Sequence, residues 1–184
     1  FRSQNAKGHL LGHVKDLGLD ISDPKVRYYQ TRRKLEYHTD SVDIVGLLCL
    51  KTAKAGGESY LASSMTVFNE VLARHPDLVP ALFEPFPTDR RGEVPEGMQQ
   101  WFDIPIFHWH AGRLSCIYVR QYIESAQRLF PGARRLTREQ REAMDGIKTS
   151  ALSLLHLIDD LLELARVDAG RMEIRTEDVD LQEL

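Results

Sequence analysis

The residues best suited to chemistry in this sequence are a histidine and an aspartate two positions apart, His38 and Asp40, just before the apolar run from Ile44 to Leu50. If this segment is a strand, both side chains point to the same face, because strand side chains alternate with a period of two. An imidazole nitrogen and a carboxylate oxygen on one face can hold one divalent metal ion. With a second histidine they would complete the facial triad that binds non-haem Fe(II) and leaves positions open for oxygen. A hydrogen-bonded pair at a strand edge, without a metal, is the alternative interpretation.

A turn signal follows this pair. Gly56 and Gly57 separate the apolar run from a second strand-like segment, Tyr60 to Ser64, and a helix is expected to begin near Thr66. A Gly-Gly pair between two apolar segments is typical of a turn that joins strands. The order of H-x-D, strand, Gly-Gly, strand and helix is more specific than any one of these pieces.

This stretch, YHTDSVDIVGLLCLKTAKAGGESYLASS, resembles the taurine dioxygenase and clavaminate synthase-like family of Fe(II)- and 2-oxoglutarate-dependent oxygenases. The similarity runs from Phe1 to about Arg141. It implies that His38 and Asp40 match the first two iron ligands and that Ser59 lies against the 2-oxoglutarate carboxylate. An ordinary turn hydroxyl remains the other interpretation of Ser59.

Two parts of the family's site have no clear counterpart in this chain. The resemblance implies a second histidine ligand and an arginine for 2-oxoglutarate, both from late strands that a long helix replaces here. His108 and His110 have a spacing that could bind a metal, but they fall in a region that precedes the distal ligand, and His156 fits better on the flank of a helix. With two of three protein ligands, we expect weak iron binding and little or no turnover.

The middle of the chain carries clear local signals. The pattern VFNEVLARHPDLVPALFE predicts a helix that stops at His75, before Pro76, and a second short helix from about Asp77. The pattern DIPIFHWHAGRLSCIYV predicts a hairpin that turns at Ala111 and Gly112. Cys49 and Cys116 are expected to be buried small residues rather than a disulfide or a zinc site.

The character of the chain changes after Leu136. Thr137 and Gln140 form a capping-box pattern at the start of a helix predicted over residues 138–168, and Gly170 can end it in a left-handed cap. An apolar stripe with spacings of four and three follows, made by Ile147, Ala151, Leu154, Ile158, Leu161 and Ala165. Such a stripe must be buried, either on the first half of its own chain or against the same helix of a second chain. The heptad spacing favours the second partner and predicts a homodimer through residues 147–165. A short strand is expected in EIRTEDVDLQEL, at the end of the chain.

The tail, ALSLLHLIDDLLELARVDAGRMEIRTEDVDLQEL, is similar to the dimerisation and phosphoacceptor domain of sensor histidine kinases. A plain amphipathic helix is the alternative interpretation. The phosphoacceptor segment and the ATP-site boxes of those kinases are absent from this sequence. We therefore expect a fusion or a truncated product that changes character at about residue 137 to 145.

Composition excludes several classes of protein. The chain has 184 residues, a net charge of −3 and 42% apolar residues, as in globular proteins. It shows no basic patch with interleaved aromatics, so no nucleic-acid partner is expected. No apolar stretch reaches the length of a membrane span and no signal peptide is visible, which makes the cytoplasm the default location.

Together these patterns predict an α+β fold in two parts. Residues 1–136 are expected to form a partial double-stranded β-helix, a jelly-roll-like sheet with helices on one side, and residues 137–184 a kinase-like helix and linker. The leading hypothesis is an incomplete Fe(II)- and 2-oxoglutarate-dependent dioxygenase that hydroxylates a small organic substrate. A sensor kinase fragment with an oxygenase-like input domain, and a purely structural helical oligomer, are the alternatives.

Overall fold

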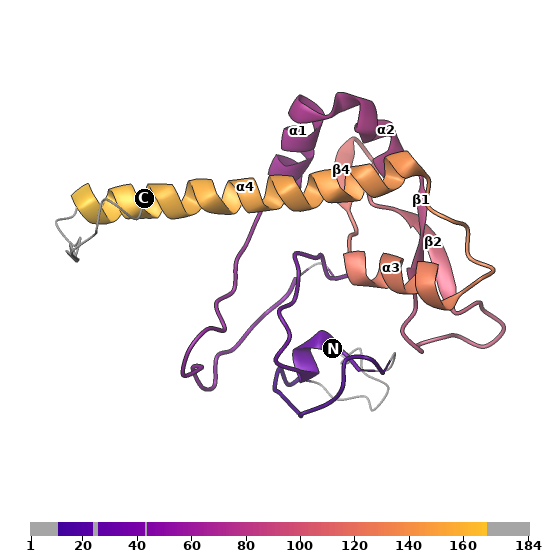
Figure 1. Cartoon of the computed structure of the whole chain (residues 1–184), viewed down its shortest axis with the longest axis horizontal. Coiled ribbons are helices and arrows are strands. Elements are labelled where there is room, and N and C mark those ends of the chain that lie inside the picture. The colour runs from indigo at the N-terminus through magenta and orange to yellow at the C-terminus, as the bar shows by residue number, and fades with distance from the viewer. Residues whose placement is uncertain (1–10, 24–25, 43, 169–184) are drawn as a thin grey trace, which may run out of the picture.

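The computed structural model describes residues 11–23, 26–42 and 44–168 and has a mixed α+β fold (Figure 1). The predicted α+β class is therefore confirmed. The elements in chain order are a 3-10 helix η1 (Tyr28–Gln30), α1 (Ser64–Arg74), a 3-10 helix η2 (Pro76–Leu78), α2 (Val79–Leu82), β1 (Pro85–Asp89), β2 (Trp101–Pro105), β3 (Phe107–His110), β4 (Arg113–Cys116), α3 (Arg120–Leu129) and α4 (Arg138–Asp168). The predicted strand at the end of the chain and the cap at Gly170 lie outside the described residues.

The strands of the described residues form two separate antiparallel pairs. β1 pairs with β2, with Phe86 opposite Ile104, and β3 pairs with β4, with His108 opposite Ser115. No larger sheet joins the two pairs within residues 11–23, 26–42 and 44–168. The jelly-roll-like sheet expected for the first 136 residues is thus present only as two short ladders.

Local sequence signals give the right element boundaries in the middle of the chain. The β3–β4 hairpin turns at Ala111 and Gly112, which have positive φ angles of 50° and 74°. Positive φ at both central residues is typical of the type I′ turns that fit the twist of paired strands. Helix α1 is capped at its start by Ser63, whose side chain accepts the Thr66 N–H, and at its end by His75, which precedes Pro76. The predicted hairpin and both predicted helices are confirmed.

The long helix α4 begins at the predicted capping box. The Thr137 backbone N–H donates to Gln140 Oε1 and the Gln140 backbone N–H donates to Thr137 Oγ1, both at 3.1 Å. Gln140 is buried, and its Nε2 also donates to the carbonyl of Pro85 at 3.2 Å. One side chain therefore caps α4 and ties it to the start of β1.

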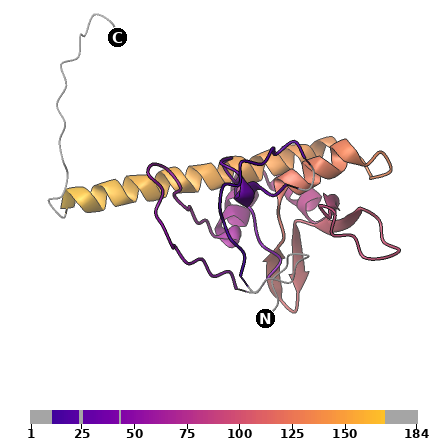
Figure 2. The same cartoon turned by 90° about the horizontal axis from the view of Figure 1, so that it is seen from below.

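The core lies where α1 and α2 pack on the N-terminal half of α4, with the hairpins beside them. Its buried members include Val71, Leu82, Phe86, Ile106, Phe107, Ile123, Ala143, Met144, Ile147 and Ala151. Ala151 is 2% exposed and Leu154 packs against this core, so the first half of the predicted stripe is buried within its own chain. In both views the C-terminal half of α4 projects away from the rest of the molecule (Figure 1 and Figure 2).

The sequence predicted a strand at His38 to Asp40 and along the apolar run from Ile44 to Leu50, and this prediction is wrong. Residues 36–42 and 44–63 contain no strand, and apolar side chains such as Ile44 and Leu61 are 88% and 89% exposed. A strand needs a neighbour for its backbone hydrogen bonds, and within the described residues this segment pairs with none of the four strands. Gly56 and Gly57 have φ of 69° and 83°, in the left-handed region that favours glycine, but they join no strands among the described residues. Cys49, expected to be buried, is exposed in this segment.

Among the described residues, no helix has the length and apolar character needed to cross a membrane.

Candidate active site

The tripeptide from His38 to Asp40 is held in place although it is not part of a strand. The Thr39 backbone N–H donates to the carbonyl of Tyr118, and the Tyr118 backbone N–H donates to Thr39 Oγ1, both at 2.8 Å. Tyr118 lies in the link between β4 and α3. These two bonds fix the middle of the tripeptide, and with it the two flanking side chains, against the folded body.

His38 and Asp40 lie side by side, as the spacing predicts. His38 Nε2 is 3.8 Å from Asp40 Oδ1, a separation that leaves room for an ion bound between them. His38 Nδ1 is 2.9 Å from the carbonyl of Glu36, which can only accept a hydrogen bond. This contact favours the tautomer with the proton on Nδ1, so that the lone pair of Nε2 faces Asp40. The same arrangement orients histidine ligands in many metal sites.

Both side chains line a cavity of about 430 Å³. Its walls come from the tripeptide, from η1, from the end of β1 with the loop that follows, from β2, and from the first turn of α3. A cavity of this size suits a small organic molecule. The wall carries apolar residues such as Phe102, Ile104 and Ile117 beside charged ones.

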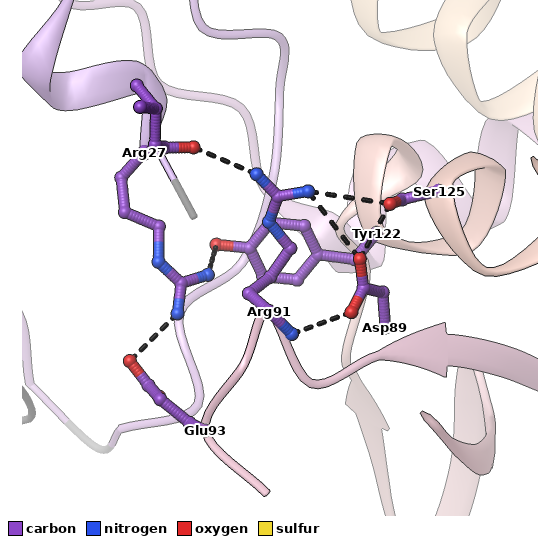
Figure 3. Close-up of polar contacts among 7 residues, drawn as sticks. Arg27, Asp89, Arg91, Glu93, Tyr122 and Ser125 are labelled. Atoms are coloured by element: carbon purple, nitrogen blue, oxygen red, sulfur yellow. Dashed lines mark hydrogen bonds and ion pairs between the residues drawn. The ribbon is translucent and has the colours of Figure 1, made fainter. Parts of the chain in front are cut away.

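A buried polar network supports one wall of the cavity (Figure 3). Arg91 Nη2 donates to the carbonyl of Val26 at 2.8 Å, and Arg91 Nη1 lies 3.5 Å from Asp89 Oδ2 and 3.4 Å from Ser125 Oγ. The Ser125 hydroxyl donates to Asp89 Oδ2 at 2.6 Å. The Arg91 and Asp89 side chains are only 8% and 4% exposed, so they form a buried ion pair with further hydrogen bonds, the arrangement that makes such a pair tolerable.

The same network attaches the segment around η1 to the body. Arg27 donates to the hydroxyl of Tyr122 at 2.9 Å and to Glu93 Oε1 at 2.8 Å. The guanidinium carbons of Arg27 and Arg91 lie 5.5 and 5.6 Å from the centre of the Tyr122 ring. Arg91 has a φ of 54°, a strained conformation for a non-glycine residue, and its backbone N–H is held by Asp89 Oδ1 at 2.7 Å.

The residues present offer two of the three donors of a facial triad. Among the described residues, no group of three or more histidine, cysteine, aspartate or glutamate side chains could hold a metal ion. His108 and His110 lie in the β3–β4 hairpin and do not line the cavity. The pair at His38 and Asp40 therefore fits a metal in donor type and orientation, but it leaves the third protein position unfilled in this part of the chain.

Ser59 is exposed and does not line the cavity, so the structure does not bring it to His38 and Asp40. Sequence interpretation also missed three cavity residues, Arg90, Arg91 and Gln121. The Asp-Arg-Arg-Gly sequence after a strand is a turn signal that could have marked the two arginines. No local pattern marks Gln121, because its position depends on the packing of α3.

The profile of the family "Taurine catabolism dioxygenase TauD, TfdA family" matches residues 1–152. The chain belongs to the TauD/TfdA dioxygenase family. It is 33% identical to "FR-33289 synthase" from Streptomyces rubellomurinus (strain ATCC 31215) over 182 residues, which are 98% of this chain and 49% of the relative. It is 30% identical to "Taurine hydroxylase-like protein SAT17" from Stachybotrys chartarum (strain CBS 109288 / IBT 7711) over 121 residues, 62% of this chain and 30% of the relative. The chain thus spans half or less of the length of these TauD-family relatives.

The kinase resemblance of the tail gains no support from these comparisons. The TauD profile extends to residue 152, beyond the predicted change at residue 137, and the alignment with FR-33289 synthase covers nearly the whole chain. The domain boundary between residues 136 and 137 stays a prediction.

Proposed function

We propose that this chain contributes His38 and Asp40 to the site of an Fe(II)- and 2-oxoglutarate-dependent oxygenase, which oxidises a C–H bond of a small organic substrate. The observation that carries the proposal is the pair His38 and Asp40, with Nε2 and Oδ1 3.8 Å apart on the wall of one cavity. Membership of the TauD/TfdA family supports the same chemistry. The family also implies a double-stranded β-helix, to which the two short ladders would contribute.

In this proposal His38 Nε2 and an oxygen of Asp40 hold the metal, which supplies the site for oxygen and for the keto acid when it is bound. The Glu36 carbonyl keeps the His38 proton on Nδ1. The two hydrogen bonds between Thr39 and Tyr118 hold His38 and Asp40 in their positions on the cavity wall. The apolar residues of the wall offer contact surface for the hydrocarbon part of a substrate. Overall, 2-oxoglutarate and O2 are converted to succinate and CO2 while one oxygen atom enters the substrate C–H bond.

Several parts of the proposal remain predictions. The third ligand, the arginine for 2-oxoglutarate and the role of Ser59 are not assigned among the described residues, and weak iron binding with little turnover is expected. A small-molecule partner, the absence of a nucleic-acid partner and a cytoplasmic location also stay predictions. Nothing in the described residues favours the signalling alternative over the oxygenase.

Release of labelled CO2 from 2-oxoglutarate labelled at C1 tests the proposal. We expect slow release of labelled CO2 that requires both added Fe(II) and O2. In Asp40→Ala the rate of release should fall to that of a reaction without protein. Asp103→Ala, which changes an exposed aspartate of β2, is the matched control and should keep the wild-type rate. Equal release by wild type and Asp40→Ala, or none that depends on Fe(II), would contradict the proposal.

A further inference from the structure

Within the part of the chain that the structure describes, one arginine of the cavity wall, Arg90, has no charged partner. Of the three arginines on its wall, Arg27 pairs with Glu93 at 2.8 Å and Arg91 pairs with Asp89 at 3.5 Å. Among the described residues, no acceptor meets the side chain of Arg90. Its guanidinium carbon lies 4.8 Å from the centre of the Phe102 ring, and its Nε is buried without a hydrogen-bond partner.

A second polar side chain on the same wall also lacks partners. Gln121 lies in the first turn of α3, and both its Nε2 and its Oε1 are buried without a hydrogen bond within the described residues. Buried polar groups in proteins are nearly always paired, because an unpaired one has lost its hydration with nothing in return. Arg91 Nε, on the same wall, is also buried without a partner, although the other nitrogens of Arg91 are hydrogen-bonded. Unpaired polar groups on one wall point to a polar ligand rather than to packing.

The charges of the cavity indicate the sign of that ligand. Asp89 and Glu93 are neutralised by Arg91 and Arg27, and Asp40 is committed to the metal in the proposed function, on which this step rests. Arg90 is then the uncompensated charge of the wall. The planar guanidinium stacked on Phe102 offers a fork of donors along its edge, which suits a carboxylate or another oxyanion.

We infer that Arg90, assisted by Gln121, binds a carboxylate or similar oxyanion of a small ligand in the cavity of His38 and Asp40. When the ligand binds, a small rotation of the Arg90 and Gln121 side chains turns their buried N–H donors toward it. Arg90 holds the anion through its guanidinium edge, and Gln121 Nε2 donates a further hydrogen bond. The oxyanion belongs either to the organic substrate or to the keto acid, since both sources present the same chemistry to an arginine.

Acetate and its neutral counterpart acetamide are the probes, titrated at constant ionic strength without added metal. The readout is the side-chain Nε–H signal of Arg90 by NMR, assigned from its loss in Arg90→Gln. We expect a saturable shift with acetate and none with acetamide. The acetate affinity, followed through backbone amide signals around the cavity, should fall at least about tenfold in Arg90→Gln. Arg90→Lys should keep more of the affinity than Arg90→Gln.

Arg113→Gln, which removes an exposed arginine of β4 outside the cavity, is the matched control and should bind acetate like wild type. Gln121→Leu should weaken acetate binding and raise the melting temperature, because it removes two unpaired buried polar atoms. If 2-oxoglutarate displaces acetate and its own binding depends on Arg90, the keto acid is the source. If its binding is unchanged in Arg90→Gln, the substrate is the source.

The inference is overturned if acetate and acetamide shift wild type alike, or if Arg90→Gln binds acetate as tightly as wild type. The comparison of the two probes on wild type decides the matter even if Arg90→Gln does not fold. Because these titrations contain no metal, the Asp40 carboxylate keeps its charge in wild type, so both probes are also titrated into Asp40→Asn, where acetate should bind more tightly than in wild type. A failure of acetate binding in Asp40→Asn is separate from a failure of the metal site at His38 and Asp40.

Discussion

Thr39 and Tyr118 exchange two hydrogen bonds of 2.8 Å, one in each direction, across 79 positions of sequence. The exchange pairs a backbone N–H with a carbonyl in one direction and a backbone N–H with a threonine hydroxyl in the other. It gives the tripeptide from His38 to Asp40 the fixed position that a strand would otherwise have supplied. The geometry of the candidate metal pair therefore depends on Tyr118, a residue that does not line the cavity.

Replacing Thr39 by valine should loosen this attachment while keeping the side-chain shape. The Tyr118 N–H would lose its acceptor, which should lower the free energy of unfolding by about 1–2 kcal/mol. Urea denaturation measures this loss. Thr39→Ser keeps the hydroxyl and should remain close to wild type. A Thr39→Val protein as stable as wild type would mean that the bond contributes nothing.

Replacing Gln140 by alanine should destabilise the chain more than an ordinary cap substitution does. It removes the acceptor for the Thr137 N–H together with the bond to the carbonyl of Pro85, so we expect a loss of about 1–3 kcal/mol in denaturant unfolding. Glu142→Ala, on the exposed face of the same turn, should cost far less. Similar losses in the two variants would count against the tie between α4 and β1.

Burial raises the pKa of the Cys116 thiol to about 12 from an ordinary value of 9.0. Between these two values the unfolded chain loses the thiol proton and the folded chain keeps it. The free energy of unfolding should therefore fall as the pH rises from about 9 to 12. Cys116→Ala should show a shallower fall over this window, whereas Cys49→Ala, at an exposed thiol, should follow wild type. Denaturation series at several alkaline pH values test this, and identical slopes for all three proteins would refute it.

The projecting half of α4 keeps the prediction of a homodimer open, but with a shorter seam. Leu157, Ile158, Leu161 and Leu164 are 56%, 42%, 63% and 62% exposed, and a second copy could cover them. Ile158→Asp would place a charge in that seam and should convert a dimer into a monomer in size-exclusion chromatography with light scattering. His156→Asp, on another side of the helix, should leave the dimer intact. A wild type that is already monomeric at micromolar concentration would contradict the prediction.

The features predicted correctly from sequence are those that neighbouring residues determine. The turn at Ala111 and Gly112, the stop before Pro76 and the cap at Thr137 each depend on a few adjacent positions. The adjacency of His38 and Asp40 also came from local spacing, although the strand that was to align them is absent. The bonds from Tyr118 to Thr39 and from Arg91 to Val26 join segments far apart in sequence, and a local pattern cannot show these partners. This is why the cavity walls could not be predicted from the sequence, while the closeness of His38 and Asp40 could.

The central claim is that His38 and Asp40 together hold a divalent metal ion, and a Co(II) titration followed by visible absorption tests it most directly. Wild type should bind one Co(II), and the affinity should fall at least about tenfold in Asp40→Ala, since one ligand is lost. Asp103→Ala, which changes an exposed aspartate away from the cavity, should bind like wild type. Equal Co(II) binding by wild type and Asp40→Ala would contradict the account.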